Sequence, residues 1–216
     1  MSVSIDFYYQ TGIYTKNGTI SLLNPNIKLA LVDKDYIPNL GLHHIWSVPD
    51  TWASATVYQV GDKVLPVTPS GFYFHCTTGG TSGVTEPTWV ETEGNTTTDG
   101  DVSWTAIIDV SFYEVASGDG YTTGGATVQD AALTRTGPIT KWDASDVVFT
   151  ALTKTFKYGV LYIDAVVNLI NKPLIAVIDL NDISASSEIV IADAVYNIEW
   201  HENGIWMSGP VADICT

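Results

Sequence analysis

Apolar and polar residues alternate with a period of two along most of the chain, a pattern typical of β-strands. It predicts strands in four early segments: NIKLALVDKDY (26–36), DKVLPV (62–67), GFYFHCTT (71–78) and DVSWTAII (101–108). Residues 146–167 predict two strands around a polar turn. The second, KYGVLYID (157–164), is apolar nearly throughout, so we expect it at the centre of a sheet.

Three further segments predict strands nearer the C-terminus: KPLIAVIDL (172–180), EIVIADAVYNIEW (188–200) and GIWMSG (204–209). Pro173 lies near the start of its strand, where a missing N–H is tolerated. Asn203-Gly204 predicts a hairpin turn between the last two strands.

Helical periodicity is nearly absent, and VQDAALTR (128–135) is the one stretch that could form a turn of helix. The opening residues MSVSIDFYYQ (1–10) could pair within their own sheet or reach another subunit as an arm. The sequence therefore predicts an all-β fold, with a jelly roll or β-sandwich as the main domain.

Composition shifts twice, which predicts a discontinuous architecture. Residues 48–108 are rich in Thr, Gly and Trp and contain a single basic residue, Lys63. We expect a host domain formed by residues 1–47 and 109–216, with a small inserted β domain at 48–108. Insertions are tolerated at surface loops, where they leave the core undisturbed.

Charge and composition exclude several function classes. The 216 residues are 45% hydrophobic and 15% charged, with a net charge of −15, so the chain can bury a core. Such an acidic chain is expected to bind neither nucleic acid nor an anionic membrane surface. The first residues lack a signal peptide, and no apolar run is long enough to span a membrane, so we expect synthesis in a cytoplasm and two reduced thiols, Cys76 and Cys215.

The segment 48–108 resembles the small carbohydrate-binding modules of the chitin-binding type. The resemblance rests on a spaced set of residues: Trp52, Tyr58, Gly61-Asp62, Val64, Gly71, Tyr73, Cys76, Pro87, Trp89 and the closing DGDVSW with Trp104. It implies a small β domain with glycan-binding aromatics. Modules of this kind also decorate phage virion proteins.

The remainder of the chain is similar to small virion proteins of tailed phages. The resemblance rests on six segments: IKLALVD followed by Tyr36, SFYEVASGDGYTTGGATV, WDASDVVF, YGVLYID, KPLIAVIDL and IEWHENGIWMS. It implies a virion structural role, as a head-decoration or fibre-associated protein.

Three aromatic residues are the candidate glycan-binding site: Trp52, Tyr58 and Trp104. A flat ring can stack on the apolar face of a sugar, and Trp52, which precedes the first strand of the insert, is the best candidate for exposure. The alternative is that a small domain without disulfides needs these rings for its core.

No other pattern predicts chemistry, so we expect no enzyme, no cofactor and no metal site. Gly61-Asp62 and Asp99-Gly100-Asp101 predict turns, and the latter lacks the spacing of a complete calcium loop. The Gly-rich SGDGYTTGG (117–125) lacks a phosphate-loop motif and predicts a tight turn. Adjacent His43 and His44 would face opposite sides of a strand and could not readily chelate one ion.

These observations together favour a capsid decoration (cement) protein on the outer head surface. Its expected partners are the major capsid protein and its own copies in a homotrimer. The insert would project outward and contact host surface polysaccharide. The alternative is a receptor-binding component of a tail fibre or baseplate, although the chain shows none of the repeats or heptads of a long fibre.

Overall fold

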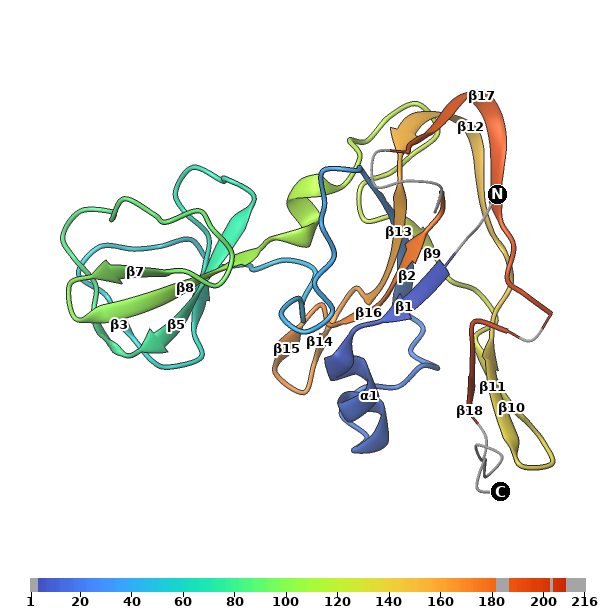
Figure 1. Cartoon of the computed structure of the whole chain (residues 1–216), viewed down its shortest axis with the longest axis horizontal. Helices are drawn as coiled ribbons and strands as arrows, with labels where there is room; N and C mark the ends of the chain where they lie inside the picture. The colour runs from blue at the N-terminus through green and yellow to red at the C-terminus, as the bar shows by residue number, and fades with distance from the viewer. Residues whose placement is uncertain (1–3, 182–186, 203, 209–216) are drawn as a thin grey trace, which may run out of the picture.

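The computed structural model describes residues 4–181, 187–202 and 204–208. Strands dominate them, and the expected all-β class is confirmed; the jelly-roll or sandwich topology stays a prediction. Two lobes are apparent in Figure 1: the insert (48–108) on the left and the host lobe, formed by the other described residues, on the right.

A five-stranded antiparallel sheet is the centre of the host lobe. Its order is β1–β16–β13–β2–β9. The bounds are Ser4–Phe7 (β1), Leu174–Asp179 (β16), Tyr158–Ile163 (β13), Ile27–Val32 (β2) and Ala126–Thr127 (β9). All six residues of β13 are buried and the strand is central, as its unbroken apolar run predicts. The N-terminal residues from Ser4 pair with β16, within their own sheet.

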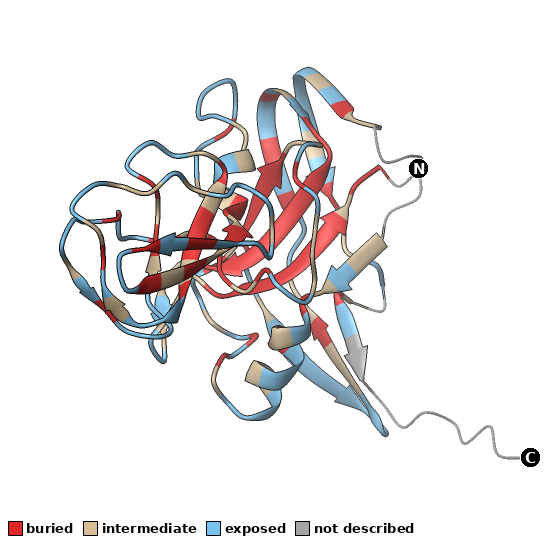
Figure 2. Ribbon diagram, turned by 60° about the vertical axis from the view of Figure 1, so that its left-hand side comes forward, coloured by how far each residue is buried: buried red, intermediate tan, exposed pale blue. Residues whose placement is uncertain are grey.

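Alternate residues of this sheet enter two different cores. In β2, Leu29 and Leu31 join the larger core, while Ala30 and Val32 join the smaller one on the opposite face. Burial on both faces is visible as nearly continuous red in the central strands (Figure 2). A sheet covered on both faces explains why these strands lack strict alternation of apolar and polar residues.

Two strand groups cover the face with the larger core. One is a ribbon of β12 (Val147–Phe156) and β17 (Ile189–Ile198). The other is a three-stranded sheet in which β11 (Ile139–Asp143) lies between β10 (Ala132–Thr136) and β18 (Trp206–Ser208). Phe149, Leu152 and Trp142 are among their contributions to the core.

Three local predictions are wrong. Residues 132–136, expected as a turn of helix, form β10 because they pair with β11. No polar turn separates β12 from β13: Lys157 alone lies between them, and β12 pairs with β17. The turn predicted at Asn203-Gly204 falls partly outside the described residues, because Asn203 does. In the described part of the chain, the last two strands do not form the predicted hairpin: β18 pairs with β11, and β17 pairs with β12.

The α-helix α1 (Tyr9–Lys16) and the short 3-10 helix η1 (Val110–Tyr113) were not expected. Among the α1 residues only Thr11 is buried, so the helix has no apolar stripe to reveal it in the sequence. The Thr11 hydroxyl anchors the helix through contacts of 3.0 and 2.9 Å to the carbonyls of Leu174 and Ile175.

Short strands form the insert. A four-stranded sheet has the order β4–β5–β8–β7, and β3 pairs with β6. The bounds are Lys63–Val64 (β4), Phe72–Thr78 (β5), Val102–Ile108 (β8), Thr96–Asp99 (β7), Val57–Tyr58 (β3) and Gly80–Thr81 (β6). Each of these strands pairs only with others of the insert.

The chain enters and leaves the insert through adjacent segments. The backbone N–H of Ser111 donates to the carbonyl of Trp46 at 3.0 Å, and the N–H of Trp46 donates to the carbonyl of Lys172 at 2.8 Å. Lys172 follows the small hairpin of β14 (Val166–Val167) and β15 (Ile170–Asn171) in the host lobe. Two passages held side by side are what an insertion into a surface loop requires.

The expected turns are present. Asp62 Oδ2 accepts from the N–H of Gln59 at 2.7 Å, and the Asp99↔Val102 pair closes a two-residue turn between β7 and β8. In SGDGYTTGG, Gly125 has φ +75° and lies against the carbonyl of Leu29, where a Cβ would clash. This turn is therefore packed against β2, and only glycine fits at that position.

Candidate functional site

The three predicted glycan-binding residues lie in the core of the insert. Exposed fractions are 8% for Trp52, 8% for Tyr58 and 0% for Trp104. Tyr58 packs edge-on against Trp104 with ring centroids 4.8 Å apart. None of the three offers a ring face to a sugar, so the expected stacking platform is corrected to the alternative, a core role. Although Trp52 precedes the first strand of the insert, its side chain belongs to the insert core.

A buried carboxylate orients these rings. Asp99 Oδ2 accepts from Trp52 Nε1 at 2.7 Å and from Trp104 Nε1 at 3.2 Å, while Oδ1 accepts from the N–H of Gly83 at 2.7 Å. Asp99 is 3% exposed. The carboxylate therefore has a structural role, because it satisfies three donors that would otherwise be buried without partners.

The opposite face of the insert sheet is turned to the host lobe. In β5, Phe74 and Cys76 enter the insert core, whereas Tyr73 lies on the other face in a cluster with Ile107 and Ile45. Cys76 is a free, buried thiol, and burial raises its pKa; Cys215 lies outside the described residues. The period-two alternation of β5 thus assigns one face to the core of the insert and one to the junction of the lobes.

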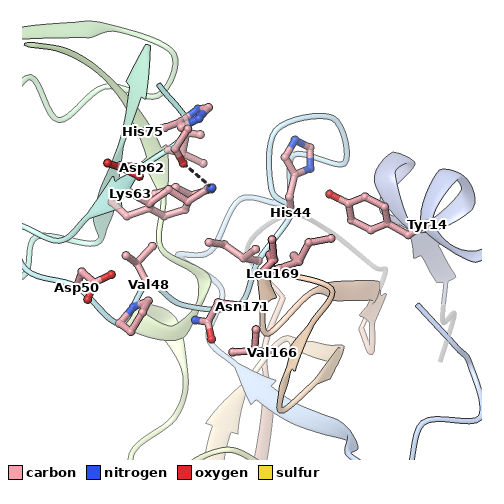
Figure 3. Close-up of a pocket in the computed structure, with 16 residues that line it drawn as sticks. Tyr14, His44, Val48, Asp50, Asp62, Lys63, His75, Val166, Leu169 and Asn171 are labelled. Carbon is pink, nitrogen blue, oxygen red and sulfur yellow. Dashed lines mark hydrogen bonds between the residues drawn. The ribbon is translucent and has the colours of Figure 1, made fainter. Parts of the chain in front are cut away.

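A cleft of about 470 Å³ opens beside this junction. Its insert wall includes Asp50, Asp62, Lys63, Tyr73 and His75, and its host wall includes Tyr14, His44, Val166, Leu169 and Asn171 (Figure 3). The volume lies in the range of about 300–1,000 Å³ that is usual for small-molecule sites. Sites of this kind commonly form between two domains.

Two polar atoms beside the cleft are buried and lack hydrogen-bond partners. They are Tyr73 Oη, in a residue 1% exposed, and His44 Nδ1. Burial lowers the pKa of His44, of His75 and of Lys63, so both imidazoles are neutral at pH 7. Lys63 Nζ donates to the carbonyl of Gly61 at 3.1 Å. Tyr73 Oη and His44 Nδ1 are enclosed behind the wall of the cleft, so the polar groups that face its interior are the side chains of Asp50, Asp62 and Asn171.

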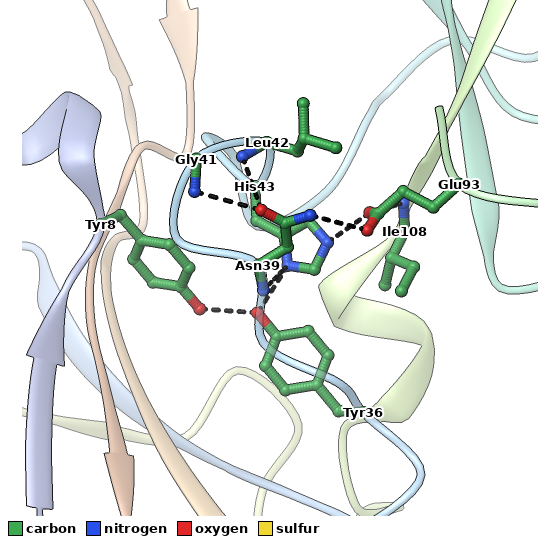
Figure 4. Close-up of polar contacts among 8 residues, drawn as sticks. All are labelled: Tyr8, Tyr36, Asn39, Gly41, Leu42, His43, Glu93 and Ile108. Carbon is green, nitrogen blue, oxygen red and sulfur yellow. Dashed lines mark hydrogen bonds and ion pairs between the residues drawn. The ribbon is translucent and has the colours of Figure 1, made fainter. Parts of the chain in front are cut away.

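A second polar cluster fastens the insert to the host lobe (Figure 4). His43 Nε2 lies 2.6 Å from Glu93 Oε1, and Asn39 Nδ2 donates to Glu93 Oε2 at 3.0 Å. On its other side, His43 Nδ1 lies 2.8 Å from Tyr36 Oη, which is 2.7 Å from Tyr8 Oη.

The contacts of His43 determine its tautomer. The backbone N–H of Asn39 donates to Nδ1 at 3.3 Å, so Nδ1 is an acceptor and the proton is on Nε2, which donates to Glu93. Burial lowers the pKa of His43, in keeping with a neutral ring. The series of hydrogen bonds from Tyr8 to Glu93 links the two lobes across their junction. Its residue types are those of a catalytic relay, but its side chains are paired with each other and none is a nucleophile placed to attack a substrate.

Comparisons with known proteins give no relative: no protein-family model, curated protein or solved structure matches the chain. Among residues 4–181, 187–202 and 204–208, no three His, Cys, Asp or Glu side chains converge as metal ligands. No helix within those ranges is long and apolar enough to cross a membrane.

Sequence reasoning missed the cleft and the junction because both join distant segments. His43 and Glu93 are 50 positions apart, and the cleft combines the helix α1, the β14–β15 turn and the insert. A usable indication was present in GFYFHCTT: Tyr73 and His75 fall on the face opposite Phe74 and Cys76, so that face could not also belong to the insert core.

Proposed function

We propose that the chain is a structural protein of a tailed-phage particle, a decoration protein that binds the outer head surface and stabilises the capsid lattice. The observation that carries the proposal is that the two lobes have separate cores. The host lobe contains the large core, while the insert has a core of its own and is joined to the host lobe through two adjacent segments of the polypeptide. An insert attached in this way can project from a shell while the host lobe binds it.

The host lobe supplies surfaces suited to neighbours. All five residues of β10 are exposed, and the β12–β17 ribbon exposes Val148, Val190 and Val195. Within the described residues, β12 and β17 pair with no strand except each other, so no third strand covers the outer edges of the ribbon. On the β12 edge, the backbone N–H of Thr153 donates to the carbonyl of Asp119 at 2.9 Å. In the assembled particle these edges would contact the major capsid protein and sister copies in a homotrimer.

The mechanism is thermodynamic linkage. A subunit that binds only the mature lattice lowers the free energy of that lattice and so resists internal pressure. The net charge of −15 suits an outward-facing surface and opposes binding to the packaged nucleic acid.

Immunogold labelling of intact particles with an antibody against this chain tests the proposal. We expect label spread over the head, and no label once the antibody is absorbed with the purified chain. Label at the tail tip alone would favour the alternative described below, and unlabelled particles would overturn a virion role.

A sharper test addresses the ribbon. Val190→Lys places a charge on a side chain that is 71% exposed, so the isolated chain should fold normally but lose self-association and head binding. Val84→Lys, at 82% exposed on the insert, is the matched control and should retain both. Light scattering and co-sedimentation with heads measure the two properties. Equal behaviour of the two variants would remove the ribbon from the proposal.

One observation favours a second function, a receptor-binding component of the tail. The cleft between the lobes has the size of a small-molecule site and a lining of polar and apolar side chains. Loss of adsorption to the host cell, with heat resistance of the heads unchanged, is the result expected of a deletion under this alternative.

A further inference from the structure

We propose that a groove between α1 and the β10–β11–β18 sheet of one copy binds the β12–β17 ribbon of a second copy of this chain. The contact rests on the self-association that is part of the proposed function, and it gives that self-association a specific site. Three observations lead to it: an open apolar groove, two cations beside the groove that lack a carboxylate partner, and an exposed acidic segment at a bulge of the ribbon.

The groove lies between α1, with the loop that follows it, and one face of the β10–β11–β18 sheet. It has a volume of about 410 Å³, and a smaller hollow of about 70 Å³ that shares Thr15, Leu22 and Trp206 extends it along the helix. Ile20 and Leu22 are buried in its lining, whereas Leu133 and Trp206 remain 46% and 38% exposed. Within the described residues no Asp or Glu lines either hollow, although the chain contains 24 of them.

The strand register places the single arginine of the sequence, Arg135, on the face of the sheet that borders the groove. Arg135 lies directly opposite Thr140, which lines the groove, and residues opposite each other share a face. Leu133, two positions earlier, lies on the same face. Arg135 Nε donates to the carbonyl of Gly137 at 2.8 Å, which holds the side chain in place and leaves its terminal NH₂ groups for a carboxylate.

Lys16 lines the groove on the α1 side and shares one property with Arg135. Six of the nine Lys and Arg side chains form ion pairs with carboxylates: Lys28, Lys34, Lys141, Lys154, Lys157 and Lys172. Lys63 donates to a backbone carbonyl. In the part of the chain that the structure describes, Lys16 and Arg135 pair with no carboxylate. Two unpaired cations beside one groove of so acidic a chain indicate that the carboxylate comes from another subunit.

The ribbon carries a segment of complementary charge and polarity. Residues 192–195 (Ala-Asp-Ala-Val) are exposed in succession, and Val195 is 65% exposed. A β-bulge interrupts the alternation here, because two residues of β17 lie opposite Thr153 of β12, and Asp193 has φ +45°. The backbone N–H of Asp193 donates to Thr153 Oγ1 at 2.8 Å, which fixes the bulge. Among the described residues, the Asp193 carboxylate has no ion-pair partner.

The positions of ribbon and groove suit a head-to-tail contact between copies. In Figure 1 the ribbon curves over the top of the host lobe, while α1 and the β10–β11–β18 sheet lie at the bottom. The ribbon of one copy therefore enters the groove of the next copy and not its own. Contacts of this kind close into rings, and a ring of three copies gives the homotrimer of the proposed function.

Charge and apolar burial have different roles in this contact. Asp193 of one copy bonds Arg135 and Lys16 of the next, which sets the partner and the orientation. Exposed ion pairs alone contribute little free energy. Val195, which packs against Leu133 and Trp206 of the next copy, supplies the buried apolar area.

The test is sedimentation velocity of the purified full chain over a range of concentrations. We expect the wild type to form trimers. Lys16→Glu combined with Arg135→Glu should raise the dissociation constant about tenfold or more, and so should Asp193→Lys alone, because like charges then meet in the contact. The three substitutions combined in one chain should restore association, since every charge is reversed together with its partner.

Two further variants make the test specific. Glu91→Lys, the same change of charge on an exposed residue of the insert, is the matched control and should associate like the wild type. Asp193→Asn removes the charge but keeps a residue that tolerates positive φ, so it should weaken association less than Asp193→Lys does. Lys16, Arg135 and Asp193 are all exposed, so thermal unfolding of each variant should match that of the wild type.

Three results would overturn the inference. One is a wild type that stays monomeric at every concentration. Another is association that the charge reversals leave unchanged, or that the combined variant does not regain. The third is a loss of head binding without a loss of self-association in the groove variant, which would assign the groove to the major capsid protein. Immunogold labelling reports the decoration role separately: labelled heads with a monomeric chain would refute this contact alone, and unlabelled particles with a trimeric chain would refute decoration alone.

Discussion

Residues of the host lobe cover both faces of its central sheet, whereas residues of the insert cover only one face of the insert sheet. In the host, Leu161 enters one core and Val160 the other. In the insert, Trp104 enters the insert core, but Ile107 on the same strand packs at the junction with Ile45 of the host. The insert is therefore structurally dependent on the host lobe, and the host lobe has no comparable need of the insert.

The two cores also differ in how their members are held. Most members of the host cores are aliphatic side chains, whose packing is non-directional, although Tyr8 and Tyr36 of the smaller core are joined by a hydrogen bond of 2.7 Å. The insert core has eight buried members, and the carboxylate of Asp99 orients two of its tryptophans. A small domain buries less area, so directional hydrogen bonds carry more of its specificity.

The largest expected effect comes from Trp104→Ala, which empties the centre of the insert core. Removing a buried tryptophan costs about 3–5 kcal/mol. We expect hydrogen exchange to accelerate throughout β5 and β8 while β13 stays protected. Trp206→Ala, at a partly exposed indole of the host lobe, is the control and should leave the insert protected. Loss of protection in β13 would contradict the independence of the host lobe.

The reciprocal change tests the other half of the comparison. Leu161→Ala removes a fully buried side chain from the central strand and should cost about 2–5 kcal/mol. Because the junction face of the insert rests on the host, we expect exchange to accelerate in both lobes. Acceleration confined to the host strands would show that the insert folds without it.

Much of the host sheet could be predicted because the polarity pattern within each strand indicates whether one or both of its faces are buried. YGVLYI is apolar at every position, which places it at the centre of a sheet covered on both faces, and β13 is there. The pairing of β12 with β17 could not be predicted, since it depends on which distant strand lies within reach. The helix α1 escaped prediction because a helix with one buried residue leaves no periodic pattern.

The candidate site was harder to predict than the fold. The spacing of the aromatic residues, which resembles that of carbohydrate-binding modules, predicted an exposed platform that included Trp52 and Tyr58. Both side chains are buried instead, because a small domain needs its large aromatic rings to fill its core. The cleft is lined instead by residues unremarkable in sequence, such as Asp50 and Asn171, which become neighbours only when the lobes dock.

A smaller effect is expected from Asp99→Asn. The substitution preserves the shape of the side chain but replaces one carboxylate oxygen with an N–H₂ group that faces existing donors. We expect a loss of about 1–3 kcal/mol, with exchange accelerated in the insert alone. Asp101→Asn is the matched control, because Asp101 is exposed in the same turn. Equal stability of the two variants, measured by chemical denaturation, would mean that packing alone orients Trp52 and Trp104.

The smallest expected effect is a pH dependence at the junction of the lobes. The groups facing His43 are Glu93, Tyr36, Asn39 and the neighbouring His44. Burial holds the pKa of folded His43 below its ordinary value of about 6.5, so the contribution of its neutral ring is complete above about pH 6.5. That contribution is lost as the pH falls toward the folded-state value, because the unfolded chain takes up the proton first.

The comparison that isolates this contribution is wild type against His43→Gln, whose amide can still donate to Glu93 but cannot titrate. Denaturation midpoints measured from about pH 8 down to about pH 5.5 should fall more steeply in the wild type. Other groups with shifted pKa values, such as Asp109, titrate alike in both proteins and cancel in the difference. A wild-type curve that falls less steeply than that of His43→Gln would show that His43 is protonated in place against Glu93, because an ion pair raises the folded-state pKa of the imidazole. The junction would then be an ion pair, and acid would leave the insert as firmly attached as it is at neutral pH.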